Sequence, residues 1–370
     1  MDKNILLACF EVPGWGGAST STYSLFEKML KLGLDVHMLN LISQNDVDFF
    51  RYYYGNKVGN PKNLPHVYNC FFNGPNNNQH QELKSIINEL QPDIVVAVGW
   101  IASLIININA PEIRLILLTA GCDQIVSYMN ENEFKDLITL QNHINNSGYQ
   151  LGITSIRERQ AIDTADLIIN HSDSNLILHN YFFHTKKGKM YQEVIWFAEW
   201  IYEDALQYIN NSKPFSEREI DVLFIASNWN RMIKNYSMVK GIINKLNNFN
   251  IHIIGQVEER HECITYHELI TERDILFKLL GNTKTVASTS LYDAAPGILF
   301  EASAMGCNVV TSKNCGNWML CNRDLLVEPY TLNSYLDKLR ISISKKFKDN
   351  MDYFISLKSF DKLVDLIDLA

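Results

Sequence analysis

The hydrophobic positions of this chain form short apolar runs separated by stretches in which apolar residues recur at helical spacing. Runs over residues 3–11, 35–41, 92–99, 114–119 and 166–172 are typical of strands buried on both faces. Between the first two runs, the apolar positions from Tyr23 to Leu30 share one helix face, and Gly33 suits the end of that helix. The pattern predicts βαβ units and therefore a parallel sheet covered by helices.

The pattern lapses over residues 186–214 and then starts again. Strands are predicted over residues 221–226, 250–255, 284–288 and 308–312, with a helix over 236–246. We therefore predict an α/β fold with two Rossmann-like, doubly wound domains. The first spans residues 1–190 and the second 191–355, and a C-terminal helix over about 356–370 packs back on the first. Ligands of such sheets bind beyond the carboxyl ends of the strands, so the expected site is a cleft that the two domains face.

Composition fits this picture and narrows the class of partner. The chain has 370 residues, 46% of them apolar and 20% charged, which suits two domains with a core each. The formal net charge of −8 argues against a general binder of nucleic acid or anionic membrane. No apolar run approaches the roughly 18 residues that cross a bilayer, and Glu11 cuts the first run short. We expect a cytoplasmic protein without a transmembrane segment or a secretory signal.

Cysteine and histidine patterns predict no metal centre. The seven cysteines are scattered, odd in number and without a C-x-x-C pair, which favours reduced, structural thiols. The ten histidines show no H-E-x-x-H or comparable ligand spacing.

One run, residues 293–306, joins two acids to the start of a predicted helix. Pro296 suits a first helical turn and Gly306 a left-handed cap, so the helix is predicted over 296–305. Its apolar face comprises Ile298, Leu299, Ala302 and Met305. Glu301 lies at the border of that face above Gly297, which leaves room for a ligand to approach the free N–H groups of the first turn. Asp293 faces the same space. The competing interpretation is that Glu301 is an ordinary solvated acid.

Two further features fall at predicted strand ends. The glycine-rich loop with Gly14, Gly16 and Gly17 matches neither G-x-G-x-x-G nor the phosphate loop, so a plain tight turn is an equal alternative. Arg231 and Lys234 follow a strand and lie within one turn of each other, although such pairs are commonly just solvated. Together with a helix N-terminus and a carboxylate, these cations suit a nucleoside diphosphate linked to a sugar.

The sequence resembles retaining glycosyltransferase family 4 (glycosyl transferases group 1), which has the GT-B fold. The acid-x7-acid signature followed by E-A-x-A-x-G is matched by Asp293, Glu301 and residues 301–306, with Asp in place of the commoner Glu. Arg231 and Lys234 look like the family's phosphate-binding pair, Gly16-Gly17 like its N-terminal loop, and residues 92–95 like its P-D-[IV]-[IV] strand start.

The resemblance implies a role for each matching residue. Arg231, Lys234 and Asp293 are the expected catalytic residues. The expected substrate-binding residues are Gly16, Gly17, Asp123, Asn228, Tyr266, Ala295, Pro296, Gly297, Ile298 and Glu301. Glu301 is expected to bind the ribose, and Asp293 with the backbone of residues 295–298 is expected to hold the donor sugar. The segment 265–267 is expected to take the place of the base-binding loop. The family's usual His is missing from residues 118–123; Asp123 stands in its region and either contacts sugar or acceptor or is only a loop acid.

The implied activity is transfer of a hexose-like sugar from a nucleotide-diphosphate donor to a hydroxyl, with retention of configuration, in glycan or glycoconjugate synthesis. No cofactor and no essential metal are expected, since protein cations meet the diphosphate. A glycan, lipid-linked or protein acceptor and peripheral membrane contact all remain open, whereas nucleic acid is not expected. Two alternatives stay open: a non-catalytic nucleotide-sugar binder or accessory subunit, and a GT-B sugar-nucleotide epimerase.

Overall fold

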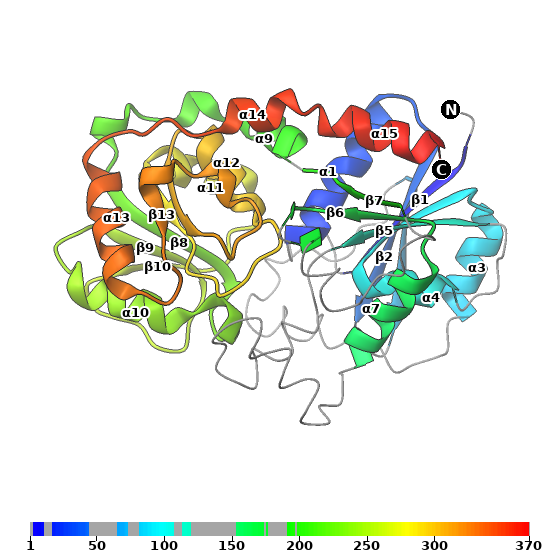
Figure 1. The fold of residues 1–370 in the computed structure, drawn as a ribbon, viewed down its shortest axis with the longest axis horizontal. Coiled ribbons are helices and arrows are strands. Elements are labelled where there is room, and N and C mark those ends of the chain that lie inside the picture. Colours follow the sequence, from blue (N-terminus) through cyan, green and yellow to red (C-terminus); the bar gives the residue numbers. More distant parts are fainter. Residues whose placement is uncertain are drawn as a thin grey trace. The chain divides into compact units, whose positions relative to one another are not determined.

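The computed structural model describes residues 3–10, 17–43, 65–72, 81–106, 113–119, 153–173, 175–176, 191–196 and 198–369. The chain forms two compact units (Figure 1). Unit 1 comprises Met1–Ile195 and Phe360–Ala370, and unit 2 comprises Trp196–Ser359. The sequence placed the corresponding boundaries at residues 190 and 355.

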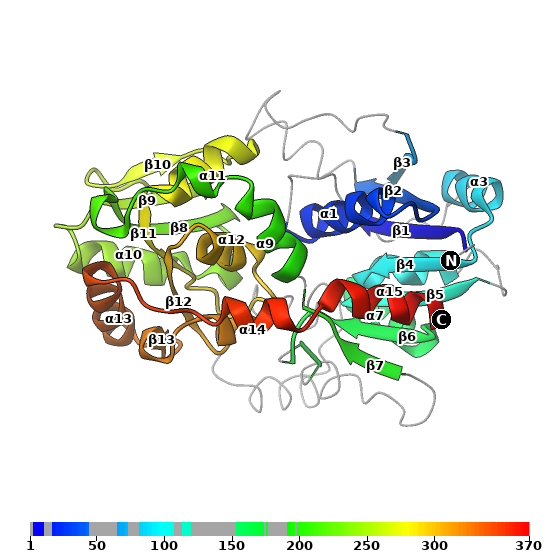
Figure 2. The same cartoon turned by 90° about the horizontal axis from the view of Figure 1, so that it is seen from above.

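Unit 1 is built on a parallel sheet of seven strands in the order β3-β2-β1-β4-β5-β6-β7. The strands are β1 (Ile5–Phe10), β2 (Val36–Ser43), β3 (Val67–Phe72), β4 (Ile94–Val98), β5 (Arg114–Thr119), β6 (Leu167–Asn170) and β7 (Tyr191–Val194). Among the described residues of this unit, the helices are α1 (Gly17–Lys31), α3 (Gln81–Leu90), η2 (Gly99–Ile101), α4 (Ala102–Ile106), α7 (Ile153–Thr164) and α15 (Ser359–Leu369). Figure 2 shows β1, β4, β5, β6 and β7 following one another across this sheet.

The predicted strands and first helix of unit 1 are confirmed. Every residue of β4 is buried, as expected for a central parallel strand with both faces covered. Gly33 takes the left-handed conformation (φ 76°) just after α1. The last helix, α15, is tied to this unit by two contacts: the Nζ of Lys3 donates to the carbonyl of Asp368 (2.6 Å), and Lys362 pairs with Glu193 (2.6 Å).

Unit 2 is built on a parallel sheet of six strands in the order β10-β9-β8-β11-β12-β13. The strands are β8 (Ile220–Asn228), β9 (Ile251–Gln256), β10 (Thr265–His267), β11 (Thr283–Ala287), β12 (Asn308–Ser312) and β13 (Leu326–Val327). The α-helices are α9 (Ala198–Leu206), α10 (Tyr236–Lys245), α11 (Arg273–Gly281), α12 (Gly297–Ala304), α13 (Leu332–Ser344) and α14 (Met351–Ser356). Short 3-10 helices are η3 (Ile209–Asn211), η4 (Phe215–Glu217), η5 (Met232–Lys234), η6 (Trp318–Leu320) and η7 (Arg323–Leu325). Two parallel-sheet α/β units confirm the predicted fold class.

Helix α12 ends where the sequence predicted, for a reason the sequence did not show. Gly306 is left-handed (φ 74°), and a Cβ there would lie 3.0 Å from Nη2 of Arg218. The buried Arg218 guanidinium donates to the carbonyls of Lys213 (3.0 Å), Thr283 (2.8 Å) and Met305 (2.8 Å). A cation therefore satisfies the carbonyl end of α12, where the helix dipole favours positive charge.

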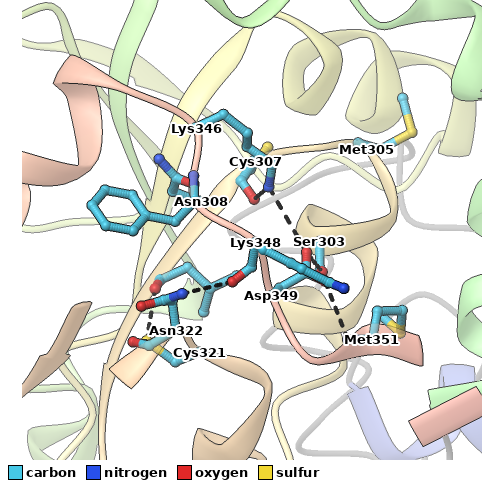
Figure 3. A network of polar contacts seen from close by, with 12 residues as sticks. Ser303, Met305, Cys307, Asn308, Cys321, Asn322, Lys346, Lys348, Asp349 and Met351 are labelled. Carbon is cyan, nitrogen blue, oxygen red and sulfur yellow. Dashed lines mark hydrogen bonds and ion pairs between the residues drawn. The ribbon is translucent and has the colours of Figure 1, made fainter. Parts of the chain in front are cut away.

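The segment between α13 and α14 is fastened to α12 and β12 (Figure 3). The Nζ of Lys346 donates to the carbonyl of Cys307 (2.9 Å), and the Nδ2 of Asn322 donates to the carbonyl of Lys348 (2.8 Å). The hydroxyl of Ser303, on α12, donates to Asp349. Burial lowers the pKa of Lys346, although Asp349 opposes this effect. This polar network holds α12 in place along its C-terminal half.

Candidate functional site

The predicted cations and the first acid lie on two loops that follow adjacent strands. Residues 229–235 follow β8 and residues 288–296 follow β11, and β8 and β11 are neighbours in the sheet. Between the loops, the N–H of Leu291 donates to the carbonyl of Ile233 (2.8 Å), and the hydroxyl of Thr289 donates to the carbonyl of Lys234 (3.0 Å). The Nζ of Lys234 lies 2.7 Å from Oδ2 of Asp293. The two loops are therefore joined into one platform.

A third loop, after β12, fixes the backbone of the same platform. The N–H of Asp293 donates to the carbonyl of Asn314 (3.2 Å), and the N–H of Gly316 donates to the carbonyl of Asp293 (2.8 Å). The Nδ2 of the fully buried Asn317 donates to the carbonyl of Pro296 (2.8 Å). Sequence reasoning missed this loop, although its run of turn-forming residues, N-C-G-N at 314–317, directly after a strand was a readable signal.

The amino end of α12 is open to an acceptor. Pro296 is its N-cap and provides no side-chain cap, and the first turn contains no acid. The N–H of Leu299 turns back to the carbonyl of Pro296 (3.1 Å), whereas the described residues offer no acceptor for the N–H groups of Ala295, Gly297 and Ile298. These three residues are only half-buried. Free donors at the positive end of a helix dipole are suited to an anion.

The two predicted cations differ in how their charge is balanced. Lys234 and Asp293 are 20% and 21% exposed and neutralise each other. Arg231 is exposed at the start of η5, and its guanidinium has no hydrogen-bonding or ionic partner among the described residues. Arg231 and the amino end of α12 thus carry the uncompensated positive charge of the platform.

Glu301 lies where the sequence placed it, in the same helix as Gly297. A Cβ on Gly297 would lie 3.3 Å from Cδ1 of Ile201, because α12 packs against α9. Ile201 therefore borders one side of Gly297, and the expected approach of a ligand to the first-turn N–H groups stays a prediction. Glu301 is 9% exposed, and its Oε1 lies 2.5 Å from Nη1 of Arg273. It is a paired, nearly buried carboxylate, which also excludes the alternative of a solvated acid.

Arg273 and Asp204 are the site residues that sequence reasoning missed. Arg273 is the first residue of α11 and bridges Glu301 on α12 to Asp204 on α9. The sequence T-E-R-D around Arg273 resembles any charged helix start, so no signal separated Arg273 from a solvated arginine.

Asn228 and Tyr266 make local contacts. Asn228 ends β8, and its Oδ1 accepts from the N–H of Asn230 (2.8 Å). Tyr266 lies in the edge strand β10 rather than in a loop, and its hydroxyl accepts from the N–H of His261 (2.9 Å) and lies 3.3 Å from that of Tyr236. Gly16 and Asp123 lie outside the described residues, and Gly17 opens α1.

Near the platform, a groove of about 300 Å³ opens between the start of α10 and the start of α13. Asn235, Met238, Leu291, Tyr330 and Leu332 are among its lining residues. Among the described residues, no three His, Cys, Asp or Glu side chains gather in a way that could hold a metal ion. In the same part of the chain, every helix is too short or too polar to cross a bilayer.

No protein-family model and no curated protein matches the sequence. Solved structures do match over nearly the whole chain. Sucrose-phosphate synthase from Thermosynechococcus elongatus has a TM-score of 0.65 at 12% identity, covering 99% of this chain and 95% of its own. WaaG, a glycosyltransferase involved in lipopolysaccharide biosynthesis, has a TM-score of 0.58 at 12% identity, with coverages of 99% and 95%.

An epimerase also matches over nearly the whole chain. UDP-N-acetylglucosamine 2-epimerase from Rickettsia bellii has a TM-score of 0.60 at 10% identity, covering 99% of this chain and 96% of its own. At such identities the likeness shows a shared GT-B fold of two parallel-sheet α/β units, and the choice of activity has to come from the site.

Proposed function

We propose that this chain is a retaining glycosyltransferase whose unit 2 binds a nucleotide-diphosphate sugar and transfers the sugar to a hydroxyl acceptor. The observation that carries the proposal is the platform in which Lys234 and Asp293 are joined at 2.7 Å ahead of the open amino end of α12. It combines cations, free N–H donors and a carboxylate, which is the set that a diphosphate and a sugar require.

The chemical task is to stabilise charge on the leaving group. When the bond between the anomeric carbon and the diphosphate breaks, the electron pair stays on the phosphate oxygen. Arg231, Lys234 and the N–H groups of Gly297 and Ile298 meet that charge, each charged contact contributing roughly 1.5–3 kcal/mol. Asp293 holds Lys234 in place and accepts from sugar hydroxyls. Since Lys234 is already paired with Asp293, the uncompensated positive charge comes from Arg231 and the free N–H groups, and we assign the leaving group to these donors rather than to a metal.

Turnover of a donor panel tests this proposal. The chain is incubated with UDP-, GDP- and ADP-sugars and candidate hydroxyl acceptors, and the released nucleoside diphosphate is measured. Arg231→Ala and Lys234→Ala each remove one charged contact. Their combined effect should lower turnover by roughly 10²–10⁴-fold. Lys240→Ala removes the exposed ion pair between Lys240, on α10, and Glu259; it is the matched control and should leave turnover unchanged. Full activity in both site variants would remove these cations from the mechanism.

A sugar-nucleotide epimerase is the second candidate, because the Rickettsia bellii epimerase matches with a TM-score of 0.60. Product analysis with donor alone separates the two enzymes: an epimerase converts the sugar without an acceptor, whereas the proposed transferase leaves it unchanged.

Calorimetric binding without any turnover on a wide acceptor panel would favour the non-catalytic alternative.

A further inference from the structure

Arg273 joins two carboxylates that come from different helices. Its Nη1 lies 2.5 Å from Oε1 of Glu301, and its Nη2 contacts Oδ2 of Asp204. The side chains are 29% exposed for Arg273, 32% for Asp204 and 11% for Glu301. The three charged side chains therefore become progressively more buried from Asp204 through Arg273 to Glu301.

The guanidinium is held in one orientation. Its two terminal nitrogens serve different carboxylates, and its Cζ lies 4.5 Å from the ring centroid of the fully buried Phe277. Burial alone would lower the pKa of Arg273, but Glu301 and Asp204 outweigh burial and raise it. A planar, permanently charged guanidinium that is held at both terminal nitrogens loses little conformational entropy when it orients a partner side chain.

Only one oxygen of Glu301 is used in this arrangement. Oε1 is bound to Arg273, whereas Oε2 accepts no hydrogen bond from the described residues and is not among their fully buried unpaired atoms. An ionised carboxylate is purely an acceptor, so Oε2 suits a ligand group that donates, such as a hydroxyl. Glu301 is therefore anchored through one oxygen, and its other oxygen keeps its capacity to accept.

We propose that Arg273 is a positioning residue: it fixes Glu301 so that Oε2 accepts the ribose hydroxyls of the nucleotide, and Asp204 fixes Arg273 in turn. The inference rests on the proposed function, since it needs a nucleotide at α12. The alternative is that the three residues only hold α9, α11 and α12 together.

Paired calorimetric titrations test the positioning role. The ligands are whichever of UDP, GDP and ADP binds the wild type most tightly, and the 2′,3′-dideoxy analogue of the same nucleotide. The wild type should prefer the ribose form by roughly 10–100-fold, as expected for hydrogen bonds to a charged group. In Arg273→Met the preference should fall below about threefold while the dideoxy form binds almost as before, since the phosphate platform is intact. Arg340→Met, which removes an exposed arginine paired with Asp337 on α13, should behave as wild type.

The remaining variants cover the other outcomes. Glu301→Gln should abolish the preference, and Arg273→Lys should restore part of it because one ammonium can still reach Glu301. If Arg273→Met does not fold, Asp204→Asn, which keeps the arginine, should still lower the preference severalfold. An unchanged preference in the Arg273 and Asp204 variants, or equal weakening of both ligands, overturns the inference. Failure of the wild type to bind any of the three nucleotides would instead overturn the proposed function itself.

Discussion

At the scale of residues, the charged side chains of the candidate site are held by partners that lie far away in the sequence. Lys234 was expected at the diphosphate and Asp293 at the donor sugar, yet their ion pair joins positions 59 apart in the chain. Glu301 was expected to bind ribose, and its contact with Arg273 joins positions 28 apart. Side-chain type is local information, whereas a partner depends on which strands and helices become neighbours. Contacts between such distant positions can therefore be identified only once the fold is known.

A second residue-scale pair predicts a pH dependence of stability. The Nδ1 of His252 lies 3.0 Å from the Nε2 of His267 on the neighbouring strand. Burial, and then the neighbouring His267, lower the pKa of His252 to about 4. In the unfolded chain the pKa of His252 is near its usual value of roughly 6.5. Between the two pKa values the unfolded chain therefore binds more protons than the folded protein. The contribution of His252 to the free energy of unfolding should therefore be complete above pH ~6.5 and be lost as the pH drops toward ~4. This loss should be about 2 kcal/mol after discounting for partial exposure of the ring.

Urea denaturation at pH 7 and pH 4.5 measures this effect. His252→Gln keeps a polar side chain without the titration, so its loss of stability between the two pH values should be smaller than that of the wild type. Equal losses in both proteins would show that the histidine pair does not contribute.

At the scale of elements, α12 shows how distant side chains define a helix that the sequence already located. Prediction gave residues 296–305, and the structure gives Gly297–Ala304 with Pro296 as the N-cap. Proline and glycine mark such ends through their own backbone restrictions, which is why a single sequence reveals them. Asn317 and Arg218 bind the two ends from positions 21 and 87 residues away, and no local signal identifies them.

Loss of the C-terminal partner of α12 should destabilise unit 2. Arg218→Met leaves the buried carbonyls of Lys213, Thr283 and Met305 without their donor, which should cost about 3 kcal/mol or more. Thermal unfolding compared with Arg323→Met, at an exposed arginine of η7, measures the difference. If both variants unfold at the same temperature, the cap does not contribute to stability.

At the scale of the whole molecule, the apolar runs predicted the fold class. Strands buried on both faces are continuous apolar segments, which are easy to recognise in a sequence. The edge strand β10 escaped prediction: its three residues, Thr265–His267, are polar or aromatic and exposed or half-buried, so they resemble a loop. The two-residue β13 carries too little pattern to be recognised at all. The expectation that both sheets face one cleft stays a prediction, as do the roles of Gly16 and Asp123.

Sugar-nucleotide chemistry on this fold depends on where a diphosphate binds. A crystal structure of the protein with a bound nucleoside diphosphate sugar tests this most directly. We predict phosphate oxygens within about 3 Å of the N–H groups of Gly297 and Ile298, with Arg231 and Lys234 alongside and the ribose on Oε2 of Glu301. A nucleotide bound instead in the groove between α10 and α13, with α12 untouched, would contradict the account.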